Sequence, residues 1–188
     1  MPTYVAFLRA INLGPRRRYP MDELRAALQA AGFADPTTYI HTGNVLLRTP
    51  MRSVARLTER LEEALSAERG FPIEVAVLTP AEVRTAAAEG EAMLAAATAA
   101  AATSGAAPPA GQYVTLLRDT PAPEAAAAFE ALSGDDARVR VSGRAVHLTL
   151  SGGYVATRLD NARAERVLGV TGTSRNLTVV RRVAADWC

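Results

Sequence analysis

The stretch TYIHTGNVLL, residues 38–47, decides how the first half of the chain folds. Strand-forming side chains occupy residues 37–41 and 45–48, and between them lie Gly43 and Asn44, which adopt positive φ angles at low cost. The pattern predicts two short strands joined by a turn. Thr42 and Asn44 also place polar atoms beside a glycine whose backbone amide a ligand is able to approach. The turn is therefore either a plain connection or part of a binding site.

The segments on either side of this hairpin extend the pattern. Residues 3–8 form an apolar strand pattern, and residues 21–32 carry apolar side chains at helical spacing before a glycine stop. Residues 53–69 repeat the helical spacing, and residues 73–78 are again strand-like. The resulting order, strand-helix-strand-strand-helix-strand, is that of a ferredoxin-like unit.

The second half of the chain repeats this order of elements, although we find no clear repeat in the letters. A helix is predicted from Thr79-Pro80 to about Ala88, and an alanine-rich stretch follows it. The tail is either a strand followed by a helix or mostly helix, with Thr173 or Ser174 as its cap. Strands are expected at residues 112–117, 138–141 and 145–150, and helices at residues 123–132 and 160–168.

The fold class that follows is α+β, an α/β sandwich of two ferredoxin-like subdomains with antiparallel sheets. We expect an N-terminal subdomain over residues 1–90, an alanine-rich connection over residues 91–111 and a C-terminal α/β subdomain over residues 112–188. A chain of 188 residues suits two small halves of this kind.

The composition excludes several kinds of chemistry. All 21 basic residues are arginine, so a lysine Schiff base, a pyridoxal-phosphate anchor and a phosphate-loop lysine are excluded. The only cysteine is Cys188, which excludes an intrachain disulfide and a thiolate zinc cluster and favours a cytoplasmic protein. No apolar run is long enough to span a membrane, and we expect neither a metal site nor a membrane partner.

Polar residues cluster at two places in the first half. Arg9 and Asn12 follow the first strand, and Arg16–Arg18 come next, either as an anion site or as a solvated loop. His41–Asn44 precede the third strand of the unit. In the usual antiparallel arrangement we expect these two clusters to lie at opposite ends of their strands, so a shared site is a hypothesis.

A third polar group lies near the C-terminus, over residues 171–176. Arg175 and Asn176 suit an anion or an amide, although the same residues also suit the capped start of a helix. Known catalytic motifs are missing from the sequence, and His41 and His147 lack metal-ligand spacing. Catalytic residues and cofactors therefore stay unassigned.

Three motifs resemble those of a known bacterial family. FLRAINLG at residues 7–14, TYIHTGNVLL at residues 38–47 and GTSRNLTVV at residues 172–180 are similar to a family catalogued as a domain of unknown function, number sixteen ninety-seven. The resemblance implies an α/β fold of two subdomains related to the ferredoxin-like plan, and it implies no activity, cofactor or catalytic residue. The positions that match the motifs are Arg9, Asn12, Gly14, Tyr39, Thr42, Gly43, Asn44, Arg175 and Asn176.

Positions that depart from the family pattern include Pro15, His41 and Leu177, the last of which stands where tryptophan is usual. Pro15 stands where the family has a glycine, which stiffens the loop and removes one amide donor. His41 stands where glutamine is usual, which weakens the case for a family-wide catalytic histidine.

The residue types favour recognition of an anion over bond breaking. Our leading hypothesis is a binding protein for an anionic small molecule, such as a nucleotide or a phosphorylated metabolite. The alternatives are an enzyme that acts on such a ligand, with His41 as general acid or base, and a nucleic-acid-binding module. Nucleic acid is disfavoured because 19 acidic residues nearly balance the 21 arginines. The proposed ligand-binding residues are Arg9, Asn12, Tyr39, His41, Thr42, Asn44, Arg175 and Asn176.

Overall fold

The chain folds into two compact units, each built on one sheet. The computed structural model describes residues 1–152, 154 and 157–188. The first unit contains residues 1–81 and Trp187, and the second contains residues 82–186 and Cys188.

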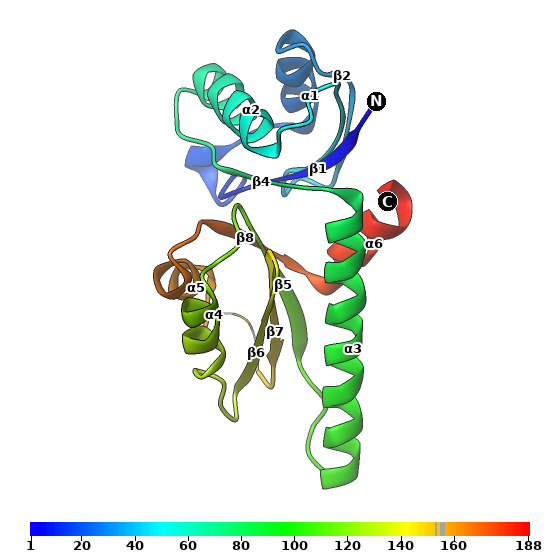
Figure 1. The fold of residues 1–188 in the computed structure, drawn as a ribbon, viewed down its shortest axis with the longest axis vertical. Helices are drawn as coiled ribbons and strands as arrows, with labels where there is room; N and C mark the ends of the chain where they lie inside the picture. The colour runs from blue at the N-terminus through cyan, green and yellow to red at the C-terminus, as the bar shows by residue number, and fades with distance from the viewer. Residues whose placement is uncertain (153, 155–156) are drawn as a thin grey trace. The chain divides into compact units, whose positions relative to one another are not determined.

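The first unit is a four-stranded antiparallel sheet with two helices on one side (Figure 1). The strands lie in the order β2-β3-β1-β4, which is the ferredoxin-like order predicted from the sequence. The elements are β1 (Thr3–Leu8), a short 3-10 turn (Pro15–Arg17), α1 (Met21–Ala30), β2 (Ala34–Tyr39), β3 (Asn44–Arg48), α2 (Val54–Arg69) and β4 (Val75–Leu78).

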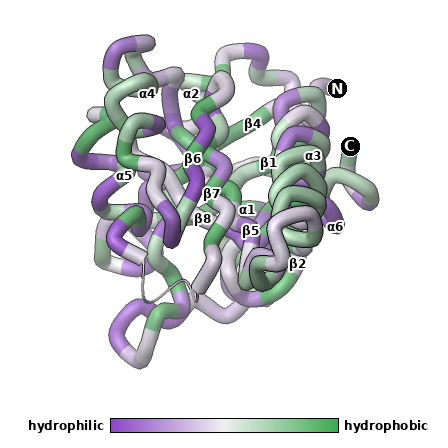
Figure 2. Tube along the Cα trace, turned by 90° about the horizontal axis from the view of Figure 1, so that it is seen from below, coloured by the Kyte–Doolittle hydropathy of each residue, from purple (hydrophilic) through white to green (hydrophobic). Residues whose placement is uncertain are grey.

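Helix α3 (Pro80–Ser104) is much longer than expected. It begins at Pro80 as predicted, but it continues past Ala88 through most of the alanine-rich stretch (Figure 2). Alanine has the highest helix propensity, so the composition that suggested a connection also sustains a helix. Helix α3 ends at Ser104, and the next residue, Gly105, has a φ of 70°.

The second unit repeats the fold of the first. Its strands lie in the order β6-β7-β5-β8, all antiparallel, with α4 and α5 on one side and α3 on the other (Figure 1). The C-terminal tail is a strand followed by a helix, and its cap is Asn176 rather than Thr173 or Ser174. The elements are β5 (Gly111–Leu117), α4 (Pro123–Glu130), β6 (Ala137–Ser142), β7 (Ala145–Leu150), α5 (Asn161–Leu168), β8 (Gly172–Asn176) and α6 (Leu177–Trp187).

Backbone hydrogen bonds at the ends of β1 and β5 align the two units residue by residue. The amide of Leu8 donates to the carbonyl of Gly43 at 2.8 Å, and the amide of Leu117 donates to that of Arg144 at 2.9 Å. In this alignment YVAFLR (residues 4–9) matches YVTLLR (residues 113–118). Four of the six residues are identical, so a short repeat in the letters, which the sequence alone did not make clear, emerges once the register is known.

The helix-covered face of each sheet forms an apolar core. In the first unit Tyr4, Ala6 and Leu8 pack with leucines of α1 and α2. In the second unit Leu117, Val146 and Leu148 pack with Phe129 and Leu168 of α4 and α5. These cores explain why the spacing of apolar residues predicted the elements correctly.

Candidate functional site

The loop after β1 and the loop before β3 lie at the same end of the first sheet. β1 and β3 are antiparallel neighbours, and Phe7 pairs with Asn44. The expectation that the two polar clusters lie at opposite ends was wrong, because in an antiparallel pair the end of one strand adjoins the start of the other. The structure therefore brings Arg9 and Asn12 to the same sheet end as His41–Asn44.

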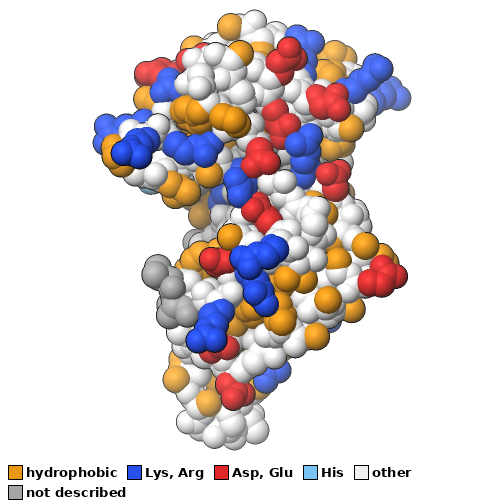
Figure 3. Space-filling view, turned by 90° about the vertical axis from the view of Figure 1, so that its left-hand side faces the viewer, with side chains coloured by type: hydrophobic (Ala, Val, Ile, Leu, Met, Phe, Trp, Pro, Cys, Tyr) orange, Lys and Arg blue, Asp and Glu red, His pale blue; other side chains and the backbone are white. Residues whose placement is uncertain are grey.

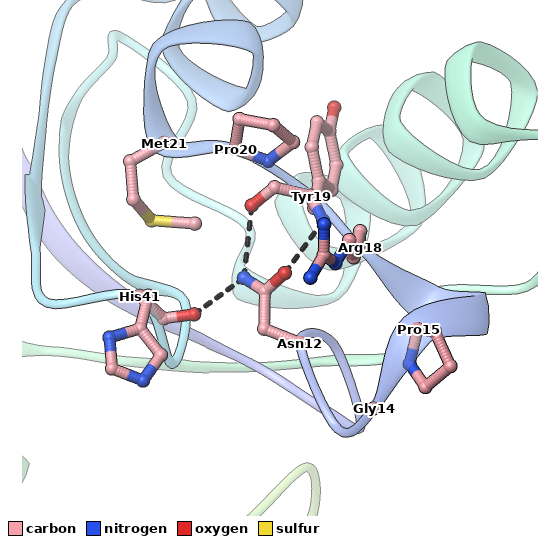
Figure 4. A pocket seen from close by; sticks show the side chains of 8 residues that line it. All are labelled: Asn12, Gly14, Pro15, Arg18, Tyr19, Pro20, Met21 and His41. Atoms are coloured by element: carbon pink, nitrogen blue, oxygen red, sulfur yellow. Dashed lines mark hydrogen bonds between the residues drawn. The ribbon is translucent and has the colours of Figure 1, made fainter.

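Asn12 joins these two loops through its side-chain amide. Its Nδ2 donates to the carbonyl oxygens of Tyr19 at 2.9 Å and His41 at 2.6 Å (Figure 4). Its Oδ1 accepts from the amide of Tyr19 at 2.7 Å. Since three backbone groups of two loops are held by one side chain, Asn12 acts here as a positioning residue.

Side-chain hydrogen bonds hold the turn between β2 and β3. Loop residues 40–43 join β2 to β3, and Asn44 is a fully buried strand residue rather than part of the turn. Asn44 Nδ2 donates to the carbonyl of Tyr39 at 3.0 Å and to Thr42 Oγ1 at 3.1 Å. A Cβ built on Gly43 would lie 2.8 Å from Leu8 Cβ, so glycine is required for the close approach of the two loops.

Both loops carry residues in an unfavourable backbone conformation. Ala10, Asn12 and Ile40 have φ angles of 53°, 55° and 47°. A β-branched residue such as Ile40 rarely adopts a positive φ, and such strain persists only where the surrounding contacts hold it. The contacts of Asn12 and Gly43 provide that support at this sheet end.

These loops and the start of α1 enclose a cavity of about 430 Å³, which we call the loop pocket. Arg18 lies at the pocket with an exposed guanidinium, and its side chain forms no hydrogen bond or ion pair with the described residues. The imidazole of His41 is exposed and points away from Asn12 (Figure 4). The pocket is lined by Asn12, Gly14, Pro15, Arg18, Tyr19, Pro20, Met21 and His41.

Backbone groups at the loop pocket also suit an anion. Helix α1 starts after Pro20 without a side-chain cap, so the first N–H groups of the helix have no side-chain acceptor there. Gly14 has a φ of 83°, and no atom lies within 4 Å of a Cβ built on it, so its backbone is open to a ligand. Pro15, where the family pattern has glycine, begins the 3-10 turn.

Two other predicted residues of the first unit lie outside the lining of the loop pocket. Arg9 forms an ion pair with Glu74 at 3.0 Å, and both side chains are partly exposed. Tyr39 ends β2 and is half-buried, and its carbonyl accepts from Asn44. Thr42 and Asn44 are engaged with each other within the hairpin.

Arg175 and Asn176 belong to the second unit. Arg175 is buried in β8, where Nη1 donates to Thr173 Oγ1 at 2.7 Å and to the carbonyl of Ser174 at 2.9 Å. Burial lowers the pKa of Arg175 to about 10, so the guanidinium is still protonated at neutral pH. Asn176 caps α6, as its Oδ1 accepts from the amide of Thr178 at 2.9 Å.

The loop pocket contains residues that the sequence did not single out as ligands. Arg18 was recognised only as part of an arginine run, in which Arg17 stacks on Phe71 and donates to the carbonyl of Pro72. Met21 was expected on the apolar face of a helix; it packs against the core of the first unit as predicted, and it also lines the pocket. The sequence carries no signal that separates Arg18 from its neighbours, because the difference lies in their contacts.

The described residues contain neither a metal-binding cluster nor a membrane-spanning helix. No group of three or more His, Cys, Asp or Glu side chains is placed there to hold a metal ion. None of the described helices has the length and apolar character needed to cross a bilayer. On the face drawn in Figure 3, basic and acidic side chains are interspersed, so the surface shows no continuous basic band there.

Comparison with known proteins identifies a family and a fold for this chain. Residues 1–147 match the profile of a family described as "Protein of unknown function (DUF1697)". The fold is similar to that of the conserved bacterial protein SP0830 from Streptococcus pneumoniae, with 20% identity and a TM-score of 0.73. That similarity covers 98% of this chain and 97% of the other, and at this identity it shows the fold alone. Among curated proteins there is no significant match.

Proposed function

We propose that this chain, which belongs to DUF1697, a family of proteins of unknown function, binds a small anionic ligand in the loop pocket. The expected ligand is a nucleotide or a phosphorylated metabolite. The observation that carries the proposal is Arg18, an unpaired cation at a cavity of about 430 Å³. A cavity of this size suits a small molecule of that class.

In this proposal the ligand phosphate lies against Arg18 and the first N–H groups of α1. A guanidinium forms bidentate hydrogen bonds with phosphate, and a helix N-terminus adds backbone donors and a favourable dipole. The carboxylates of Asp22 and Glu23 in the first turn of α1 would repel an anionic ligand, but neither residue lines the pocket, and Glu23 pairs with Arg69 at 2.6 Å. Pro15, Pro20 and Met21 supply apolar contacts for the rest of the ligand.

The residues proposed from the sequence take different roles here. His41 contacts the ligand, while Asn12, Thr42 and Asn44 hold the loops in place. Arg9 and Tyr39 stay proposals for the margin of the site. Arg175 and Asn176, in the second unit, are not part of the proposed pocket.

The test is a thermal-shift screen against nucleotides, sugar phosphates and coenzymes, followed by calorimetric titration of any hit. Arg18→Gln is expected to weaken binding about tenfold or more, because a charge-assisted hydrogen bond is lost. Arg16→Gln is the matched control, since Arg16 is also exposed and does not line the pocket. Full affinity in Arg18→Gln, or no stabilising ligand in the panel, would contradict the proposal.

A second variant tests the positioning role of Asn12. Asn12→Ala removes one hydrogen bond that joins the two loops and two that hold the loop of residues 9–20 together, and it is expected to lower both ligand affinity and the free energy of unfolding, the latter by about 2 kcal/mol. Unchanged affinity in a folded Asn12→Ala protein would show that the ligand does not depend on the loop geometry.

An enzymatic role is the second candidate, and it rests on the position of His41 at the same pocket. As general acid or base, His41 would serve turnover rather than affinity. His41→Gln is then expected to keep ligand binding and to lose turnover of the identified ligand. Turnover that survives in His41→Gln with an unchanged pH profile would rule out this role.

A further inference from the structure

The second unit contains a groove between α3 and the edge strand β6 that the proposed ligand site does not use. Two cavities, of about 550 Å³ and 590 Å³, lie along it, and Met93 and Arg138 line both. Each is within the usual size range of a small-molecule site. We call this feature the α3–β6 groove.

One wall of the groove is apolar. Ala96, Ala97 and Ala100 of α3 line it together with Met93. Alanine methyl groups are too short to fill the space between a helix and a sheet, so this part of α3 leaves a gap along an apolar surface. Such a surface suits an aliphatic chain.

The opposite rim carries two cations. Arg138 and Arg140 stand two residues apart on β6, opposite Thr149 and His147 of β7. His147 faces α3, since its Nδ1 lies 3.5 Å from a Cβ built on Gly90, and cross-strand partners share a face. Within the described residues neither guanidinium forms a hydrogen bond or an ion pair.

The base of the groove adds a buried donor without a partner. Thr149 lines the groove and donates through Oγ1 to Oε1 of Gln112, which is only 3% exposed. The Nε2 of Gln112 has no hydrogen-bond partner among the described residues. Buried side-chain amides of this kind are normally hydrogen-bonded, so this donor is available to an acceptor on this face of the sheet.

An extended peptide does not fit β6 as an added strand. The outward amide of Val139 donates to Ser133 Oγ at 2.9 Å, and that of Val141 donates to Glu130 Oε1 at 2.6 Å. Because these donors are already used, the edge offers no ladder of free N–H groups for strand addition.

We propose that the α3–β6 groove binds an amphipathic anion, with its carboxylate or phosphate group between Arg138 and Arg140 and its aliphatic chain along the alanines of α3. Arginine pairs well with both head groups. Asp135 lines the groove on the side of the alanines, and Glu130 lines it at the Arg138–Arg140 end, where its Oε1 already accepts from the amide of Val141. Because two guanidinium groups face that single carboxylate, the head group lies at the Arg138–Arg140 end.

The test is calorimetric titration of the full chain with decanoate and with decyl phosphate, which distinguishes a carboxylate from a phosphate source. Arg138→Gln/Arg140→Gln is expected to weaken binding about tenfold or more. Arg163→Gln/Arg166→Gln on α5 is the matched control, since it removes the same charge from a helix on the opposite side of the sheet (Figure 1). Ala100→Leu should abolish binding of both compounds by filling the groove, while circular dichroism reports the fold.

Four results would overturn the proposal. They are no binding of either compound, equal binding of uncharged decanol, equal binding of inorganic phosphate without a chain, and equal loss of affinity in the α5 control. Arg18→Gln should leave decanoate binding unchanged, because the loop pocket lies elsewhere in the chain. The experiment therefore tests the α3–β6 groove independently of the proposed ligand site in the loop pocket.

Discussion

The two units of the chain share one plan and differ in two places. Their sheets have the same strand order, and their backbone bonds align Leu8 with Leu117 and Arg9 with Arg118. Even the second helices match, because both α2 and α5 have a side-chain N-cap and a glycine C-cap in the left-handed region. The shared strand order, register and helix caps are therefore the features that determine the fold of each unit.

The first difference lies in the loops at one sheet end. Residues 9–20 connect β1 to α1, whereas only residues 118–122 connect β5 to α4. Residues 40–43 join β2 to β3, whereas residues 143–144 suffice for β6 and β7. All the described non-glycine residues with positive φ belong to the first unit. The longer loops and most of these residues with positive φ, which have no counterpart in the second unit, lie around the loop pocket. This difference favours a binding role for that end of the first sheet.

The second difference lies in the face of each sheet opposite its two covering helices, which are α1 and α2 in the first unit and α4 and α5 in the second. Val5 of the first unit pairs with Leu46 and Leu78, and the equivalent Val114 pairs with His147 and Arg175. One plan thus carries an apolar face in the first unit and a polar one in the second. Since the fold is the same, the polar residues are not needed to form it.

The largest expected effect tests the two hairpin glycines. Gly43→Ala should lower the free energy of unfolding by about 3 kcal/mol, because a Cβ at positive φ would also lie 2.8 Å from Leu8 Cβ. Gly143→Ala in the second hairpin should cost only about 1 kcal/mol, since Gly143 has a φ of 53° but no atom within 4 Å of its Cβ position. Urea unfolding followed by circular dichroism measures both. Equal costs would show that the two loops of the first unit are not tightly packed.

An intermediate effect tests the polar face of the second unit. Burial lowers the pKa of His147, with a further lowering from Arg140 and an opposing influence from Glu89, whose Oε2 lies 3.1 Å from Nε2. The unfolded chain then binds a proton more readily than the folded one, so stability is full above about pH 6.5 and falls as the pH decreases below it, by at most about 1.4 kcal/mol per pH unit.

Replacement of His147 removes that dependence if the assignment is correct. In His147→Gln the free energy of unfolding should change less between pH 7 and pH 5 than in the wild type. His41→Gln is the matched control, because it removes the only other imidazole of the chain from an exposed position. Should His41→Gln flatten the profile and His147→Gln leave it steep, the burial argument fails.

The smallest effect tests a feature that the units share. Glu62 of α2 accepts from the amide of Val75 at 2.9 Å, and Glu165 of α5 accepts from the amide of Gly172 at 3.0 Å. Val75 and Gly172 are equivalent first residues of β4 and β8. Glu62→Ala and Glu165→Ala should each lower the free energy of unfolding by about 1 kcal/mol in urea. A large difference between them would break the equivalence of the two units at this contact.

Much of the fold could be predicted because its signals are local. The apolar spacing in residues 3–8 and 53–69 and the glycine stops reflect one core per unit, and the core decides the elements. The length of α3 was missed because alanine is compatible with both a linker and a helix. The cap of α6 was misplaced because β8 extends to Asn176.

The site was predicted only in part because its signals are not local. The chain motifs pointed to Asn12 and His41, yet the meeting of their loops depends on the register of β1 and β3. Arg16, Arg17 and Arg18 are identical letters, and only their contacts leave Arg18 free at a cavity. Whether Arg9 or Arg175 contacts a ligand stays a prediction.

The carboxylates that accept hydrogen bonds from the first amides of β4 and β8 also affect whether the sheet edges of different molecules are able to pair. An open strand edge is a template on which another chain is able to add and polymerise. Here Glu62 and Glu165 occupy donors on two edges, Ser133 and Glu130 occupy those of β6, and Pro36 removes one from β2. In the language of polymer chemistry, each sheet carries its own chain-terminating groups, which disfavours growth of a continuous sheet from one molecule to the next.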